Sequence, residues 1–157
     1  MRKTTAVTGK RPLKDFLAAF GDKPMILPDC QVVDSDRADR GRILRAFSRA
    51  GWIPTWSGNS ADAVEASWLQ DPSWDGNAFS VQPIPGLRIN FFSGPEVLFD
   101  LDLRELTSEG ALQAVYDVIA RVGLATGKHI TVSQEGTWDD VVVAYDPKTA
   151  SFSWASA

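Results

Sequence analysis

The chain has 157 residues, 44% of them hydrophobic, and a formal net charge of −4, which suits a single globular domain over residues 1–157 with a substantial core. It contains neither the run of about 20 apolar residues of a membrane span nor a secretory signal, so we expect a cytoplasmic protein. Because Cys30 is its only cysteine, an internal disulfide is excluded. Residues 1–50 carry 11 Lys or Arg against 6 Asp or Glu, whereas residues 51–157 carry 5 against 14. This acidic larger part argues against binding of nucleic acid and favours a protein partner with a basic surface, and the lack of an apolar span leads us to expect no membrane partner.

The N-terminal third predicts two helices. Residues 1–10 lack periodicity, and we expect a loose arm there. A first helix begins near Pro12 and ends near Gly21, with apolar residues at helical spacing between them. Residues 23–36 mix apolar pieces with two prolines, which favours a short strand or an extended connection. Residues 37–50 have the pattern of an amphipathic helix with an arginine-rich side.

The middle of the chain changes from a tryptophan-rich segment to strands. Residues 52–77 hold four of the six tryptophans among turn residues, and we expect one short helix at residues 61–69. The role of this segment stays open. Residues 79–82 and 87–91 then alternate apolar and polar side chains, as half-buried strands do, and the turn "PIPG" separates them.

The stretch "VLFDLDLREL", residues 97–106, predicts a third strand. Its apolar residues alternate with Asp100, Asp102 and Arg104, which we therefore expect on the polar face of the sheet. The hairpin register with the preceding strand places Arg88 opposite one of the two aspartates, in an ordinary cross-strand ion pair. Two alternatives stay open: an acidic patch that binds a partner, or a carboxylate pair that holds a hard cation or does acid/base chemistry.

Residues 106–123, "LTSEGALQAVYDVIARVG", form the clearest helical pattern. Thr107 suits the N-cap, and one long apolar stripe must cover a sheet. A further strand is expected over residues 128–134 and a hairpin over residues 141–154. The predicted fold class is α+β: a mostly antiparallel sheet of about five to six strands, packed by one long helix, with N-terminal helices.

The final hairpin sets "VVVAY" against "ASFSW" around a four-residue loop, "DPKT". This register pairs Val143 with Phe152 and Val141 with Trp154, so that the apolar side chains share one face. We therefore expect Trp154 in the core.

His129 is the only histidine and falls on the polar side of its predicted strand. Together with Asp100 and Asp102 it would suit a small metal-assisted hydrolase. The sequence contains neither a nucleophile elbow nor a phosphate-binding loop, and Gly127 in "GLATGKH" is explained as a helix C-cap. We expect no catalytic residue, no metal and no cofactor, and keep the hydrolase as the alternative.

Arg42, Arg45 and Arg49 lie near one another on one side of the predicted helix of residues 37–50. Such a run is typical of a solvated helix face. Two other roles stay open: ion pairs with the acidic sheet of the same molecule, or docking on an acidic protein, which would make the chain a regulatory or structural subunit.

Trp138 stands in "QEGTWDD", beside Asp139 and Asp140. Aromatic residues are enriched both in cores and at the centres of interfaces. An exposed tryptophan flanked by carboxylates would anchor a basic partner surface. The candidate partner-binding residues are therefore Asp100, Asp102, His129, Trp138, Asp139 and Asp140.

The run "LTSEGALQAVYDVIARVGLATGKHITVSQEG", followed by "VVVAYDPKTASFSW", resembles the C-terminal half of small bacterial immunity proteins, which neutralise polymorphic or contact-delivered toxins. The resemblance covers about residues 95–154. It implies a cytoplasmic, non-enzymatic protein that binds a cognate toxin and often occludes its active site. These families share neither one fold nor a functional motif, so no catalytic residue carries over. An acidic face with a tryptophan is also complementary to the basic clefts of toxins that act on nucleic acid.

Overall fold

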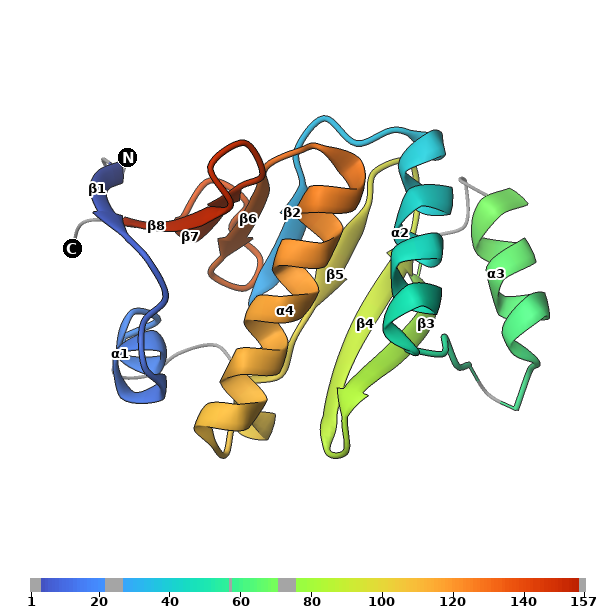
Figure 1. Cartoon of the computed structure of the whole chain (residues 1–157), viewed down its shortest axis with the longest axis horizontal. Coiled ribbons are helices and arrows are strands. Elements are labelled where there is room, and N and C mark those ends of the chain that lie inside the picture. The colour runs from blue at the N-terminus through green and yellow to red at the C-terminus, as the bar shows by residue number, and fades with distance from the viewer. Residues whose placement is uncertain (1–3, 22–26, 57, 71–75, 156–157) are drawn as a thin grey trace.

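The computed structural model describes residues 4–21, 27–56, 58–70 and 76–155. Within these ranges the helices are α1 (Leu13–Ala18), α2 (Arg37–Ala50), α3 (Ala61–Gln70), α4 (Glu109–Thr126) and the 3-10 helix η1 (Leu103–Glu105). The strands are β1 (Thr4–Thr8), β2 (Asp29–Val32), β3 (Gly76–Ile84), β4 (Leu87–Ser93), β5 (Leu98–Asp100), β6 (Ile130–Ser133), β7 (Val141–Asp146) and β8 (Ser151–Ala155). They form one sheet in the order β1-β8-β7-β6-β2-β5-β4-β3 (Figure 1).

The α+β class is confirmed, and every neighbouring pair of strands in the sheet is antiparallel. The sheet has eight strands rather than the predicted five to six. The two additional strands, β1 and β2, both come from the N-terminal part of the chain. In the described part of the chain, no helix combines the length and the apolar character needed to cross a membrane.

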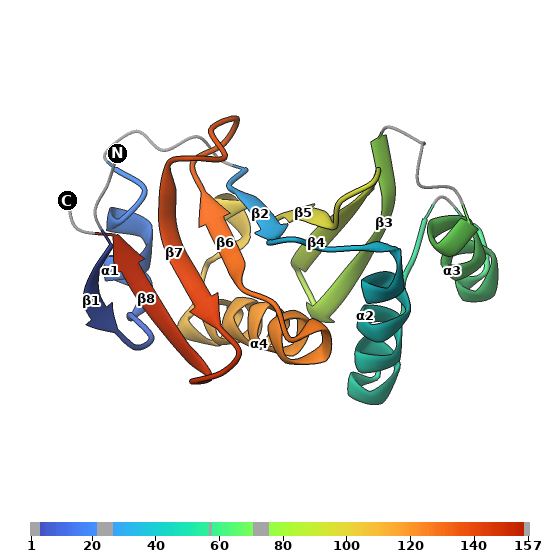
Figure 2. The same cartoon turned by 90° about the horizontal axis from the view of Figure 1, so that it is seen from above.

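β2 joins the two halves of the sheet. β3, β4 and β5 form one meander and β6, β7 and β8 another, and β2 lies between them, paired with β5 and with β6 (Figure 2). Because β5 and β6 are both antiparallel to β2, they are parallel to each other and need the long crossover that contains α4. Cys30 and Val32 are fully buried, so this segment is a core strand rather than an extended connection.

The first residues of the described chain are not a loose arm. β1 pairs with β8, with Thr8 opposite Ser153. The indole nitrogen of Trp154 donates to the carbonyl of Gly9 at 2.7 Å, and the Arg11 guanidinium lies 4.4 Å from the centre of the same indole ring. The prediction of a free arm is therefore wrong from residue 4 onwards. Its partner strand lies at the other end of the sequence, where local periodicity carries no information.

The ends of α2 follow the capping residues of the sequence, and its predicted range is confirmed. Asp36 and Asp39 form a capping box in which each side chain accepts from the backbone N–H of the other. Gly51 ends the helix in a left-handed conformation, at φ 78°. The short helix predicted at residues 61–69 is also present, as α3.

The long helix α4 begins one residue later than predicted. Its N-cap is Ser108, whose side chain accepts from the Ala111 N–H at 3.1 Å, rather than Thr107. Gly127 is the C-cap at φ 67°, as expected from the sequence.

α2 and α4 lie on one face of the sheet, and α3 lies beside its edge strand β3 (Figure 2). Aromatic side chains fill much of the core between the helices and the sheet. Near β8, Phe16 of α1 packs edge-on against Tyr116 of α4 and Trp154, with ring centroids 5.8 and 5.7 Å apart. Farther along the sheet, Phe91 and Phe99 stack across β4 and β5 at 4.9 Å. Trp154 is thus a core residue, as predicted.

The third predicted strand is shorter than expected. β5 ends at Asp100, and the chain turns into η1, for which Asp102 is the N-cap. The alternation of apolar and polar residues continues through this stretch because Leu101 and Leu103 are buried in the turn as they would be in a strand.

The register of the final hairpin differs from the prediction by two residues. Val143 pairs with Trp154 and Tyr145 with Phe152. β7 extends to Asp146, so the loop is formed by residues 147–150. Shifting the strand pairing by two residues keeps the same side chains on each face of the sheet. The residues predicted to face the core therefore still face it, although the predicted register is wrong.

Gly123 marks the closest approach of α4 to the sheet. A Cβ at this position would lie 2.6 Å from Cδ2 and 2.7 Å from Cε2 of the buried Tyr145 ring. Replacing Gly123 with Ala is therefore expected to lower the free energy of unfolding by about 1–3 kcal/mol, measured by urea denaturation. Gly110→Ala in the same helix is the control, because its nearest neighbour is Ser108 Oγ at 3.7 Å. A stable Gly123→Ala protein would contradict this packing.

Candidate functional site

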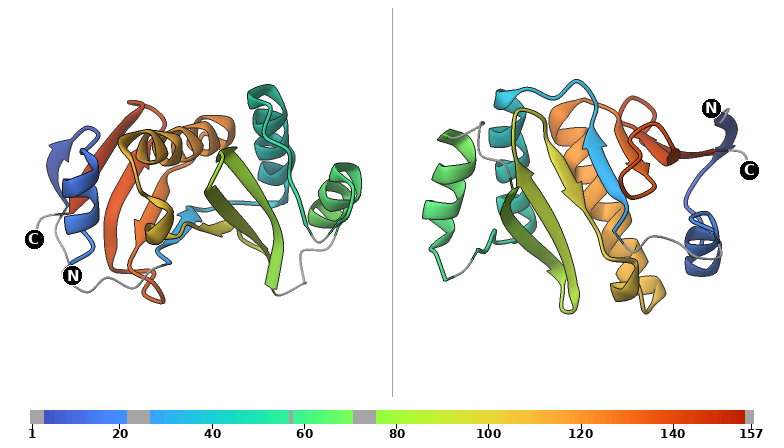
Figure 3. Two further views of the ribbon diagram at one scale, coloured as in Figure 1. Left: turned by 90° about the horizontal axis from the view of Figure 1, so that it is seen from below. Right: turned by 180° about the vertical axis from the view of Figure 1, so that it is seen from behind.

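The face of the sheet opposite α2 and α4 carries a row of polar side chains. In the view from behind, this face is toward the reader and the two helices lie behind the strands (Figure 3, right). The strand register places Asn90, Asp100, Asp29 and Ser133 side by side on β4, β5, β2 and β6. Two carboxylates therefore stand directly opposite each other in neighbouring strands. Such a like-charged pair is destabilising unless its surroundings compensate for it.

Four carboxylates gather at this end of the sheet, and we call Asp29, Asp100, Asp102 and Glu135 the acidic cluster. Asp100 is its buried member, with 7% of its surface exposed. Burial raises the pKa of Asp100 to about 6, and the charges of the other three members act in the same direction. The Asn90 amide opposes this shift by donating to Asp100 Oδ1 at 2.9 Å. Asp100 is therefore too covered to be a contact residue and instead contributes negative charge from beneath the surface.

Asp102 has a different partner from the one predicted. Arg104 Nη2 lies 2.8 Å from Asp102 Oδ2, and this hydrogen-bonded ion pair lowers the pKa of Asp102. The register of β4 and β5 points toward Arg88 as the opposing residue, but β5 ends at Asp100, before that position. The predicted cross-strand pair with Arg88 is thus replaced by a local pair within η1.

The β6–β7 loop, residues 134–140, is held in place by hydrogen bonds between its own backbone groups and by one from the Ser133 side chain. The N–H of Gln134 donates to the Asp140 carbonyl at 3.1 Å, and the Ser133 hydroxyl donates to the Trp138 carbonyl at 3.2 Å. Thr137 accepts from the Asp140 N–H at 3.1 Å. The loop therefore presents its side chains in one defined backbone conformation.

The same loop is tied to the acidic cluster. The Gly136 N–H donates to Asp29 Oδ2 at 2.7 Å, and Glu135 Oε1 accepts from the Leu27 N–H at 2.7 Å. Two of the four cluster carboxylates, Asp29 and Glu135, therefore accept hydrogen bonds that connect the β6–β7 loop to β2 and to Leu27, just before β2. The cluster and the loop form one acidic end of the sheet.

Trp138 projects from this loop with 44% of its surface exposed. Asp139 beside it is exposed, and Asp140 is partly exposed. An indole that is accessible, flanked by carboxylates and mounted on a hydrogen-bonded loop has the chemistry of a protein-binding anchor. The structure thus places Trp138, Asp139 and Asp140 on one loop, and this loop is bonded to Asp29, the strand neighbour of the buried Asp100.

His129 is not part of this group. It precedes β6, whereas the loop follows β6, so the strand separates the two. Its Nε2 lies 3.6 Å from Asp146 Oδ1, and the side chain is exposed. The combination of His129 with Asp100 and Asp102, on which the hydrolase alternative depends, is therefore not assembled. Among the residues that the structure describes, no group of three His, Cys, Asp or Glu side chains is arranged to hold a metal ion.

The arginines of α2 do not neutralise the acidic cluster. Phe47 of α2 packs against Phe91, on the helix-covered face of β4, at 5.4 Å between ring centroids, whereas Asn90 and Asp100 point to the other face. Arg42, Arg45 and Arg49 are exposed on the outer side of the helix layer. The α2 arginines and the acidic cluster thus lie on opposite sides of the sheet, so the alternative in which they form ion pairs with each other is not realised.

Lys128, which follows the C-cap of α4, has a structural role. Its ammonium lies 2.7 Å from a carboxylate oxygen of Asp39, which is fully buried, and donates to the Asp34 carbonyl at 2.7 Å. The bond to Asp39 raises the pKa of Lys128. The Gly-Lys pair in "GLATGKH" therefore ties the end of α4 to the start of α2.

Two residues of the site escape sequence reasoning. Asp29 belongs to a segment whose sequence does not distinguish a strand from a connection, and Glu135 is one of many acidic residues in loops. The available signal was the period-two pattern of "DCQV", which would have placed Asp29 on the polar face of a strand. The residues beside Asp29 in the neighbouring strands are known only from the tertiary structure.

Compared with protein-family models, curated proteins and solved structures, the chain has no match. The resemblance to immunity proteins therefore rests on the sequence pattern alone, and function has to be argued from the surface itself.

The two aspartates on either side of Leu101 are expected to affect stability with opposite signs. Because the pKa of Asp100 is raised from 3.8 to about 6, its ionisation weakens the folded state progressively as pH rises through this window. Asp100→Asn should therefore raise the free energy of unfolding by about 1–2 kcal/mol at pH 8, after allowance for solvent screening, and by little near pH 4. Urea denaturation across this pH range measures both values.

Asp102→Asn is the matched control. The pKa of Asp102 is lowered, so its charge stabilises the folded state above its unfolded pKa and this contribution disappears as pH falls. The variant should be destabilised at neutral pH and approach the unmodified protein in acid. Equal effects of the two substitutions, or a gain for Asp100→Asn that does not change with pH, would contradict the assignment.

Proposed function

We propose that the protein is a non-enzymatic binding protein, and most concretely an immunity protein that neutralises a cognate bacterial toxin by occluding a basic surface of it. The contact region is the acidic end of the sheet, centred on Trp138. The observation that carries the proposal is the exposure of this indole between carboxylates on a loop that is already hydrogen-bonded in place.

Trp138 and the carboxylates around it would anchor and steer a basic partner from a loop that is already ordered. A tryptophan that becomes buried when the complex forms is among the commonest sources of binding energy at the centre of an interface. The surrounding carboxylates would attract a basic partner and set the docking register. Because hydrogen bonds that involve Ser133, Asp140 and Asp29 already hold the loop, docking would cost little conformational entropy.

The residues have different roles under this proposal. Trp138 is the anchor, and Asp139 and Asp140 form its charged rim. Asp102 contributes at the edge, already paired with Arg104. Asp100 acts only through its charge, and His129, at the other end of β6, lies outside the contact region. A cytoplasmic location is part of the proposal, since a toxin that acts inside the cell must be blocked there.

The test is protection from a toxin. The protein is co-expressed with each product of the neighbouring genes of its source genome, and growth of the host is scored. We expect one product to be toxic alone, to be neutralised by this protein, and to co-purify with it in a fixed ratio. If no neighbouring product is neutralised or bound, the proposal is wrong.

Substitution of the anchor locates the surface. Trp138→Ala is expected to weaken the complex by about 30-fold, the effect of losing a central aromatic contact of about 2 kcal/mol, as measured by calorimetry. Leu124→Ala is the control, because Leu124 is also exposed, at 57%, but belongs to α4 on the helix side of the sheet. Loss of binding in the control but not in Trp138→Ala would move the interface to the helix layer.

The acidic rim is expected to act mainly on the rate of association. Asp139→Asn combined with Asp140→Asn should slow association and reduce its dependence on ionic strength, while dissociation changes less. Stopped-flow mixing at low and high salt separates the two rates. An unchanged association rate at low salt would remove these two carboxylates from the docking path.

A further inference from the structure

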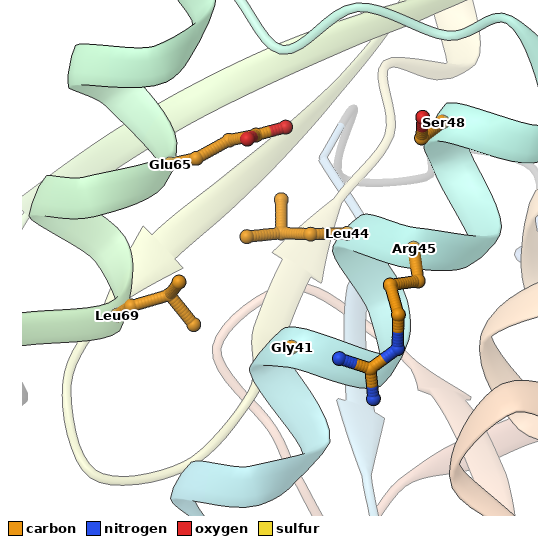
Figure 4. A pocket seen from close by; sticks show the side chains of 6 residues that line it. All are labelled: Gly41, Leu44, Arg45, Ser48, Glu65 and Leu69. Atoms are coloured by element: carbon orange, nitrogen blue, oxygen red, sulfur yellow. The ribbon is translucent and has the colours of Figure 1, made fainter.

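A groove runs between α2 and α3 on the helix side of the molecule (Figure 4). Its volume is about 290 Å³, and it is lined by Gly41, Leu44, Arg45, Ser48, Glu65 and Leu69. Figure 2 shows α2 on one face of the sheet and α3 beside the edge strand β3, and none of the lining residues belongs to the acidic cluster. Nothing in the proposed function uses it.

The two walls of the groove are fixed relative to each other. Arg37, at the start of α2, donates from Nε and Nη2 to the Leu69 carbonyl at 3.0 and 2.9 Å, and from Nη2 to the Gln70 carbonyl at 2.9 Å. These bonds cap the C-terminal end of α3 with a guanidinium. Gly41 adds no side chain on the α2 wall, although glycine inside a helix costs up to about 1 kcal/mol relative to alanine. The groove is therefore both held in shape and kept open.

The floor is apolar and the walls carry opposite charges. Leu44 and Leu69 line the floor, and Leu69 has 37% of its surface exposed. Arg45 lies on the α2 wall with the exposed Arg42 and Arg49 along the same helix, whereas α3 contains acidic residues and no basic one. On α3, Glu65 extends toward the groove (Figure 4).

Short side chains are exposed on the outer face of α3. Ala63, Ala66 and Ser67 are exposed there, and short side chains allow another helix to approach closely. A surface with one basic wall, an apolar centre and one acidic wall is complementary to itself when it is rotated by 180° about an axis along the groove, because the basic wall of each copy then faces the acidic wall of the other. Self-complementarity under a two-fold rotation is the requirement of a symmetric dimer interface.

We propose that the α2–α3 groove binds a second copy of this chain. In this dimer, α2 of each protomer lies against α3 of the other, so that Arg45 faces Glu65 of the partner subunit twice across the axis, and the exposed Leu69 side chains are covered. The acidic ends remain on the far sides of the two sheets, free for a partner. The dimer is weak, because two short helices provide less area than a standard stable interface of about 1,600 Å².

Charge reversal tests both the interface and its symmetry. Sedimentation equilibrium of the full chain, at up to about 1 mM protein and low salt, should show a monomer–dimer equilibrium that weakens as salt is added. Arg45→Glu and Glu65→Arg should each raise the dimer dissociation constant at least tenfold, because each places two like-charged pairs across the axis. Lys148→Glu, in the exposed β7–β8 loop, is the control with the same charge change and should dimerise normally.

The decisive sample is an equimolar mixture of Arg45→Glu and Glu65→Arg. In a two-fold dimer this mixture restores both opposite-charge contacts, so a heterodimer should form although neither variant dimerises alone. The Arg45→Glu, Glu65→Arg double variant should likewise dimerise. Circular dichroism first establishes that each variant is folded, and a misfolded one is replaced by Arg45→Gln or Glu65→Gln, for which a smaller loss of dimer is expected.

Three results would overturn the proposal: a wild-type protein that stays monomeric over the whole range, a dimer that both reversals leave intact, or variants whose mixture does not restore association. The last result would mean that Arg45 and Glu65 do not face each other across a two-fold axis. Because the groove and the acidic end are separate surfaces, Trp138→Ala should leave dimerisation unchanged, so the two proposals fail independently.

Discussion

The structure depends on the pairing of one four-residue strand. β2 supplies the hydrogen bonds that connect the β3–β4–β5 meander to the β6–β7–β8 meander, and no other pair of strands in the described sheet joins these halves. Its position also decides the connectivity, because β5 and β6 on either side of it become parallel and α4 must cross between them. The crossover lays α4 over the sheet, where Gly123 allows contact with Tyr145.

The same strand creates the acidic cluster. With β2 inserted, Asp29 stands opposite Asp100 on one side and Ser133 on the other, and the loop that follows β6 reaches Asp29 through the Gly136 N–H. Because neighbouring residues of a strand point to opposite faces, the acids collect on one side and the arginines of α2 remain on the other. The separation of the acidic cluster from the α2 arginines is therefore a consequence of topology as much as of composition.

What could be read from the sequence is local. The boundaries of α2, the presence of α3 and α4 and the β3–β4 hairpin follow from capping residues and from periodicity, which act within a few residues. The misplaced elements have two causes: β1 needs a partner strand, β8, at the other end of the chain, whereas β5 ends early because Asp102 caps η1 and pairs locally with Arg104, which the period-two pattern does not reveal. Trp138, Asp139 and Asp140 can be proposed as one candidate surface from the sequence because they are adjacent in it. Asp29 and Glu135 cannot be grouped with Asp100 in this way, because only folding brings them together.

The acidic cluster also shows why the candidate surface differs from an ordinary polar sheet face. A neutral residue at position 100 would keep the hydrogen bond with Asn90 and avoid both the burial of a charge and its repulsion by Asp29. The chain carries the carboxylate instead, and it uses Asp29 and Glu135 to hold the neighbouring loop. Departures from the most stable local choice are expected where a surface serves a function. Negative charge beneath the Trp138 loop would strengthen the field that a basic partner meets during approach, which gives a buried, otherwise unfavourable aspartate a physical reason to be there.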